Sequence, residues 1–291
     1  MQEQSTLILV TGSNGQLGNE FKSLAESFPE YSFVFTDVND LDITKKDEVF
    51  TFFRKHKPAF CFNCAAYTAV DKAEEDKELA YLINSTAVQH LAIACKLHDT
   101  KLIHFSTDYA YDSVTERPIL ETDPSAPKSI YGLSKRAGEE VLEQSDIDWI
   151  CLRISWLYSS YGHNFVKTML RLGKERNTLQ IVSDQVGAPT YAGDLADSVM
   201  NIIKKDKGYR QHYNFSNSGI TNWADFAREI MLLKNLECDI QNTSTAAYGA
   251  PAPRPLWSVM SHDKIKETYG LKIPSWQESL KKCLWLIGRK S

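Results

Sequence analysis

Hydrophobic residues recur with two different periods along the first half of the chain. Short apolar runs rich in β-branched residues predict strands at 6–11, 31–36, 59–65, 101–106 and 148–155. Between these runs, apolar residues return at helical spacing and predict helices at 16–27, 45–56, 80–97 and 129–144. Alternating strands and helices are joined by right-handed crossovers, so this half predicts an α/β fold with a doubly wound parallel sheet.

After residue 156 the alternation loosens. Helical spacing continues at 165–174, 194–203, 222–234 and 276–286, and short strand-like runs occur at 179–182 and 212–215. We find neither an internal repeat nor a low-complexity linker between the halves. We therefore expect a first domain over residues 1–156 and a smaller C-terminal region over 157–291 that packs directly on it and returns some segments to the sheet.

Composition and charge narrow the classes of protein. The 291-residue chain is 43% hydrophobic and 24% charged, as in ordinary globular proteins, and its net charge of −4 shows no basic footprint for nucleic acid. No run reaches the roughly 18 apolar residues of a membrane helix, and residues 1–4 lack the basic start of a signal peptide. We expect a cytoplasmic location and no membrane partner.

The cysteines point to structure rather than chemistry. Six cysteines are too few for a disulfide scaffold in a chain of this length. Cys61 and Cys64 form a CxxC pair, but both fall in a predicted strand, where they point to opposite faces. Because no second Cys/His pair completes a zinc site, we interpret this pair as structural and predict no metal ligands.

Three glycines follow the first strand and open the first helix. A glycine-rich turn at that place lets a pyrophosphate approach the backbone and the helix N-terminus. The GxxGxxG spacing differs by one residue from the GxGxxG fingerprint, but the strand, the helix and Asp37, about 20 residues further on, supply the expected context. The loop therefore predicts dinucleotide binding by Gly12, Asn14, Gly15, Gln16, Leu17 and Gly18.

Asp37 bears on the choice of dinucleotide. A carboxylate at the end of the second strand can accept a hydrogen bond from a ribose 2′-hydroxyl and would repel a 2′-phosphate. No Arg or Lys stands at 36–39. The sequence therefore leans toward NADH over NADPH, although a loop side chain such as Lys45 could reach a phosphate.

Tyr131 and Lys135 are candidates for acid–base chemistry. They are four residues apart and therefore share one face of the predicted helix at 129–144. A nearby ammonium stabilises a tyrosine phenolate, so the pair makes a general acid that protonates an alkoxide as hydride arrives, or a base in reverse. Thr107, at the exit of the strand at 101–106, adds a hydroxyl where a substrate oxygen would lie; its alternative role is a strand-end cap.

With these residues, the chain resembles the extended short-chain dehydrogenase/reductases and, among them, the dTDP-4-dehydrorhamnose reductase family. The resemblance runs nearly from end to end. The glycine loop and residues 131–135 are shared by the superfamily. The more specific matches lie at 63–74, 106–109, 153–156, 164–170, 184–190 and 254–255.

The resemblance implies a Rossmann-like fold that binds NADPH or NADH, with substrate binding mainly in 157–291. The implied reaction reduces the C4 ketone of dTDP-4-dehydro-β-L-rhamnose in dTDP-rhamnose biosynthesis. Tyr131 would donate a proton to the C4 oxygen, Lys135 would bind the nicotinamide ribose, and Thr107 would hydrogen-bond the reacting oxygen. The cofactor would also be lined by Asp42, Ile43, Ala65, Ala66 and Tyr67. The implied contacts to the dTDP-sugar, its diphosphate included, are Asp108, Tyr109, Trp156, Asn164, Lys167 and Arg254.

Two positions depart from the family pattern. Tyr111 stands where Phe is usual, and we expect this change to leave the packing intact. Some members resemble Mg²⁺-bridged dimers built from glutamates; Glu20 keeps one matching position, whereas Gly193 occupies the other. This departure argues against Mg²⁺ and against that dimer, so we expect a monomer or a weak homodimer.

Other functions occur on related scaffolds. A nucleotide-sugar 4,6-dehydratase needs an acidic pair after the threonine, whereas Asp108 is followed by Tyr109. A 4-epimerase uses the same Tyr and Lys with a retained cofactor, and the sequence does not separate it from a reductase. A non-catalytic subunit, like the regulatory β subunit of methionine adenosyltransferase, would use the scaffold to bind a partner. An enzyme is favoured by the joint presence of Thr107, Tyr131, Lys135 and Trp156.

Overall fold

A computed structural model describes residues 5–111 and 116–290 of the chain. Its centre is a six-stranded parallel sheet with the order β10-β5-β4-β3-β1-β2. The order reverses at β1, which has β2 on one side and β3 on the other, and such switch points are where these sheets bind ligands. The strands are β1 Thr6–Thr11, β2 Tyr31–Phe35, β3 Phe60–Asn63, β4 Lys101–Thr107, β5 Trp149–Ile154 and β10 Gln211–Phe215. The predicted doubly wound sheet is confirmed.

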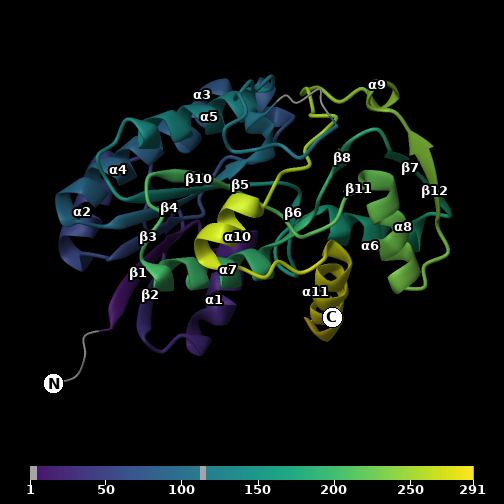
Figure 1. Ribbon diagram of the computed structural model, residues 1–291. Coiled ribbons are helices and arrows are strands. Elements are labelled where there is room, and N and C mark those ends of the chain that lie inside the picture. Colours follow the sequence, from purple (N-terminus) through teal and green to yellow (C-terminus); the bar gives the residue numbers. More distant parts are fainter. Residues whose placement is uncertain (1–4, 112–115, 291) are drawn as a thin grey trace.

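Helices cover both faces of the sheet (Figure 1). One face packs against α2 Lys46–His56, α4 Ala87–His98 and α5 Ile130–Glu143, and the other packs against α1 Gln16–Leu24 and α7 Ala192–Lys205. Cys61 lies in the apolar cluster of the first face and Cys64 packs against that of the second, so the CxxC pair is split as predicted.

The C-terminal region has an apolar cluster of its own, formed with α6 Phe165–Glu175, α8 Trp223–Leu233 and α11 Trp276–Lys290. Its short strands pair as β6 Leu157–Tyr158 with β9 Thr190–Tyr191, β7 Thr178–Val182 with β12 Asp239–Thr243, and β8 Val186–Gly187 with β11 Thr221–Asn222. The remaining helical segments are α3 Lys77–Tyr81, α9 Thr245–Tyr248, α10 Asp263–Tyr269, η1 Ala25–Ser27, η2 Lys72–Glu74, η3 Leu82–Thr86 and η4 Asp108–Ala110.

Two features differ from a simple division of the chain into halves. The predicted helix at 80–97 is split into α3, the π-helical turn η3 and α4. β10 comes from the C-terminal half but pairs with β5, and α7 packs on the same sheet (Figure 1). Segments beyond residue 156 therefore help to build the first domain, while the boundary at 156 stays a prediction.

Candidate active site

Tyr131 and Lys135 lie one turn apart on α5. The start of this helix is capped, because Ser129 Oγ and Glu74 Oε1 accept hydrogen bonds from backbone N–H groups of the first turn at 3.1 and 2.9 Å. Lys135 Nζ donates to the carbonyl oxygen of Phe105 at 2.6 Å. These contacts hold the first turn of α5 at the carboxyl end of β4.

The Tyr131 phenol lies beside the residues that follow β4. Its ring meets that of Tyr109 edge-on, with centroids 5.4 Å apart, and its hydroxyl lies near the Thr107 side chain. Burial raises the pKa of Tyr131 to about 12; the Thr107 hydroxyl opposes this rise and the Asp108 charge adds to it. The Lys135 ammonium is directed to the Phe105 carbonyl oxygen, and its stabilisation of the Tyr131 phenolate stays a prediction. The phenol is protonated at neutral pH, as a proton donor must be.

Two buried charged groups accompany the phenol. Lys135 is 2% exposed, and burial lowers the pKa of its ammonium to about 8. Asp108 is also 2% exposed, and burial raises the pKa of its carboxyl to about 6, against the hydrogen bond that Thr107 donates at 3.0 Å. Shifted, buried titratable groups clustered in this way are typical of functional sites.

A cavity of about 280 Å³ opens beside the glycine loop, at the switch point of the sheet. Gly12 has a φ of +60°, and a Cβ there would lie 2.6 Å from the Ala65 backbone, so only glycine allows this approach of the loop to the end of β3. This narrow cradle fits the adenosine side of a dinucleotide, with phosphates at the N-terminus of α1. The predicted cofactor residues that line it are Gly12, Gly15, Asp37, Asp42, Ile43, Ala65 and Ala66.

The other predicted cofactor residues lie around this cavity rather than in its wall. Leu17 and Gly18 are buried in α1. Gln16 accepts a hydrogen bond from the residue that caps α6, at 2.9 Å. The backbone of Tyr67 is held by the side chain of Asn84, at 2.9 and 3.1 Å. Their direct contact with a cofactor stays a prediction.

Asp37 faces the glycine loop, where its carboxylate accepts a hydrogen bond from Asn14 N at 2.9 Å. Lys22 Nζ donates to the Asn14 side chain at 2.9 Å, so a cation that the sequence reasoning missed lies close to Asp37. Lys45, the cation considered from the sequence, is paired with two carboxylates of its own turn. Asp37 therefore lines the cofactor cavity, while Lys22, which does not line it, contacts the same residue of the glycine loop, Asn14.

A larger cavity of about 700 Å³ has the size of a small-ligand site and is lined by residues from both regions. Four residues predicted for the substrate line it: Asp108, Tyr109, Trp156 and Arg254. Sequence reasoning missed much of the rest of the wall, because aromatic and apolar residues at helical spacing are also typical of a core. The missed residues include Phe165, Thr168, Met169, Leu172, Arg176, Gln185, Trp223, Tyr248 and Ser258.

Trp156 is held in a strained conformation at this wall. Its φ of +48° is unusual for a bulky residue. Its indole stacks on Trp223 with centroids 3.9 Å apart and planes at 15°, and Trp223 Nε1 donates to Gln185 Oε1 at 3.1 Å. Backbone strain that the surroundings enforce in this way is typical of binding sites.

The three residues predicted for the diphosphate separate in the structure. Asn164 caps α6 by accepting from Lys167 N at 3.1 Å, and it donates to Gln16 Oε1 at 2.9 Å. This geometry favours a capping role for Asn164, and neither Asn164 nor Lys167 lines the 700 Å³ cavity. Arg254 does line it, and both terminal nitrogens of its guanidinium bind Asp71, at 2.9 and 2.8 Å.

The glutamate position considered for Mg²⁺ does not fit a cation site. Glu20 Oε1 accepts a hydrogen bond from Ser159 at 2.5 Å, and Gly193 offers no side-chain ligand. Within the described residues, one group has the spacing of metal ligands: Glu139, Cys151 and His212. Both carboxylate oxygens of Glu139 already accept hydrogen bonds from Arg153. The expected monomer or weak homodimer stays a prediction.

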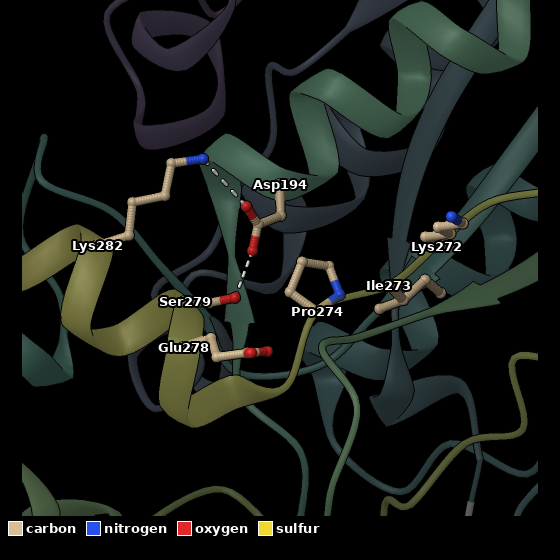
Figure 2. Close-up of a pocket in the computed structure, with 7 residues that line it drawn as sticks. All are labelled: Asp194, Lys272, Ile273, Pro274, Glu278, Ser279 and Lys282. Carbon is tan, nitrogen blue, oxygen red and sulfur yellow. Dashed lines mark hydrogen bonds and ion pairs between the residues drawn. The ribbon is translucent and has the colours of Figure 1, made fainter.

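A third cavity, of about 470 Å³, is lined by α7, α11 and the segment before α11 (Figure 2). Asp194 accepts hydrogen bonds from Ser279 and from Asn217, the latter at 2.9 Å, and Lys282 Nζ lies 3.4 Å away. These contacts fasten α11 to the start of α7. Asp194 and Lys282 therefore serve packing at this cavity, and no predicted site residue lines it.

Residues 6–288 match the family of the RmlD substrate binding domain. The chain belongs to this family. The dTDP-4-dehydrorhamnose reductase of Aggregatibacter actinomycetemcomitans is 38% identical over 94% of this chain and 97% of that protein. The spore coat polysaccharide biosynthesis protein SpsK of Bacillus subtilis (strain 168) is 38% identical over 96% and 97%. The crystal structure of dTDP-4-dehydrorhamnose reductase from Bacillus anthracis str. Ames in complex with NADP has a TM-score of 0.93 and 37% identity, covering 97% of this chain and 99% of that one.

Membership of the RmlD substrate binding domain family confirms the resemblance predicted from the motifs. It also confirms the Rossmann-like fold and the class of NAD(P)-dependent oxidoreductase. Within residues 5–111 and 116–290, every helix is too short or too polar to cross a membrane.

Proposed function

We propose that this protein reduces the C4 ketone of dTDP-4-dehydro-β-L-rhamnose to dTDP-L-rhamnose, with Tyr131 as the proton donor. The relatives named dTDP-4-dehydrorhamnose reductase support the reaction. The observation that carries the chemistry is the Tyr131 phenol, kept protonated beside the Thr107 hydroxyl at the end of β4. It lies next to Tyr109, which lines the large cavity.

Each catalytic side chain has one task in this reaction. A bound NAD(P)H would supply the hydride that reaches C4. Tyr131 transfers its phenolic proton to the C4 oxygen, and the Thr107 hydroxyl turns from Asp108 to donate a hydrogen bond to the same oxygen. Lys135, whose pKa is about 8, is mostly an ammonium at pH 7 and stabilises the phenolate that remains. A positioned general acid contributes roughly 10²–10⁴ in rate.

Different parts of the wall of the 700 Å³ cavity contact different parts of the substrate. The stacked rings of Trp156 and Trp223 form a flat apolar surface for the sugar. Arg254 contributes a positive charge for the diphosphate, while Asp108 and Tyr109 also line the cavity, and the Tyr109 ring contacts that of Tyr131.

The test is oxidation of NADH and NADPH, followed by absorbance, with dTDP-4-dehydrorhamnose generated in situ. Wild-type protein should oxidise one cofactor per substrate, which neither a cofactor-retaining epimerase nor a binding subunit does. Tyr131→Phe should lower kcat by about 10²-fold or more and leave cofactor affinity nearly unchanged, because it removes the acid alone. Wild-type turnover in this variant would show that Tyr131 is not the acid.

For the cofactor, we propose that Asp37 biases the protein toward NADH. Asp37→Ala should raise the ratio of kcat/KM for NADPH to that for NADH by about tenfold, because a repulsive charge is lost while Lys22 remains to meet a 2′-phosphate. Lys22→Ala in the same background should reverse the gain. An unchanged ratio in Asp37→Ala would contradict this role.

A further inference from the structure

Asp71 takes no part in the reaction as described so far. It lies on the loop after β3, before η2, and its carboxylate contacts the C-terminal segment. Asp71 Oδ1 accepts hydrogen bonds from Arg254 Nη1 at 2.9 Å and from Ala252 N at 3.2 Å, and Oδ2 accepts one from Arg254 Nη2 at 2.8 Å. The Asp71 carboxylate therefore holds both the Arg254 guanidinium, which lines the cavity, and the backbone two residues before it.

The geometry of this pair leaves part of the guanidinium available. Arg has five N–H donors. Nη1 gives its two to Asp71 and to the Ala252 carbonyl, the latter at 3.1 Å, and Nη2 gives one to Asp71. The N–H of Nε and the second N–H of Nη2 have no hydrogen-bond partner among the described residues. These two donors form the other fork of the guanidinium, whose spacing matches two oxygens of a phosphate.

We propose that Asp71 is a positioning residue that holds Arg254 with this second fork toward the diphosphate of the nucleotide-sugar. The inference rests on the proposed function, in which Arg254 meets the diphosphate. Arg254 has a long side chain, and a ligand that must first order it binds more weakly. Asp71 avoids this loss of affinity, because it fixes the guanidinium at two atoms before the ligand binds.

The sign of the effect separates positioning from simple electrostatics. Asp71→Asn removes a negative charge beside the cavity, so charge alone would tighten the binding of an anion. Positioning predicts the opposite, because the amide replaces one of the two acceptor oxygens with an NH2 donor and so cannot form the bidentate pair with the guanidinium. The direction of the change in affinity for an anionic ligand therefore decides between them.

The experiment is calorimetric titration of dTDP into wild type, Asp71→Asn, Arg254→Ala and the double variant, with the affinity for NADPH measured in parallel. Asp71→Asn should raise the dTDP Kd by about tenfold and the KM of the sugar nucleotide similarly, with kcat and the NADPH Kd nearly unchanged. In the Arg254→Ala background it should have no further effect. Asp71→Glu should restore part of the affinity.

Asp123→Asn is the matched control, because Asp123 binds Arg117 through two bonds of 2.8 Å and neither residue lines the cavity. It should leave dTDP binding unchanged. Equal or tighter binding of dTDP by Asp71→Asn overturns the inference, as does a further loss in the double variant. Failure of wild type to bind dTDP would instead overturn the proposed function.

Discussion

Burial acts on each titratable side chain that we place next to the reacting oxygen. It is the largest cause of the raised pKa of Tyr131, the raised pKa of Asp108 and the lowered pKa of Lys135. All three shifts disfavour the charged form. For a reductase this environment keeps the phenol protonated, as the proton donor must be. The same burial makes the ionised carboxylate of Asp108 lower the stability of the fold.

Asp108→Asn should therefore stabilise the folded protein, and more so at pH 8 than at pH 5. The pKa of Asp108 is raised from 3.8 to about 6, so ionisation penalises the folded state fully above pH 6 and not below pH 3.8. This difference in pKa corresponds to at most about 3 kcal/mol in the free energy of unfolding. Urea unfolding at the two pH values measures the gain; the same gain at both would show that the charge of Asp108 is not its source.

Among the elements, the π-helical turn η3 connects the cofactor loop to the catalytic helix. It passes α5 at Gly138, where a Cβ would lie 2.1 Å from the carbonyl oxygen of Asn84. The Asn84 side chain accepts from Tyr67 N at 2.9 Å and donates to Ser134 Oγ at 2.9 Å. Short π-helical turns are frequent at functional sites, and here the turn holds Tyr67 and α5 in register.

Gly138→Ala should lower the free energy of unfolding by about 1–3 kcal/mol, because the added methyl forces η3 away from α5. It should also raise the KM for NAD(P)H, since Asn84 moves with the turn. Gly288→Ala on α11 is the control: its Cβ would have open space apart from a lysine tip 4.0 Å away, so alanine should stabilise by about 0.5–1 kcal/mol. Thermal and urea unfolding compare the two variants, and equal stabilisation of both would contradict the close contact.

At the scale of the whole molecule, features that depend on residues close together in the sequence could be predicted, and features that depend on residues far apart in the sequence could not. The strands and the pair of Tyr131 and Lys135 could be predicted because periodicity and an i, i+4 spacing are local signals. The cavity wall could not, because packing alone brings its residues together. Tyr111 illustrates the difference: the change from Phe was expected to leave the packing intact, but no local signal indicated that its hydroxyl accepts from Arg153 at 2.6 Å and donates to Asn214 at 3.0 Å, joining β5 to β10.

At the centre of these hydrogen bonds, a buried ion pair joins α5 to β5. Arg153 is 3% exposed and Glu139 is fully buried, and two hydrogen bonds of 2.9 and 2.6 Å join them. Burial opposes the ionisation of Glu139, but the bonds and charge of Arg153 lower its pKa below 4.5. The pair therefore contributes stability above pH 4.5 that is lost as the pH falls through the lowered pKa.

Arg153→Met should destabilise the fold by about 3–5 kcal/mol, because it removes the two short hydrogen bonds of the buried Glu139 carboxylate and leaves it with the longer contact to Arg136, at 3.3 Å. Adding Glu139→Leu should recover most of this loss, since neither charge of the pair then remains, and should weaken the dependence of stability on acid. Activity should not recover fully. The charge of Glu139 supports the ammonium of Lys135, one turn away on α5, so its removal should lower the pKa of Lys135 below about 8 and move the alkaline fall of kcat/KM for NAD(P)H to lower pH. Urea unfolding and pH–rate profiles of the single and double variants measure both effects. A double variant with restored stability and an unshifted profile would limit the ion pair to a structural role.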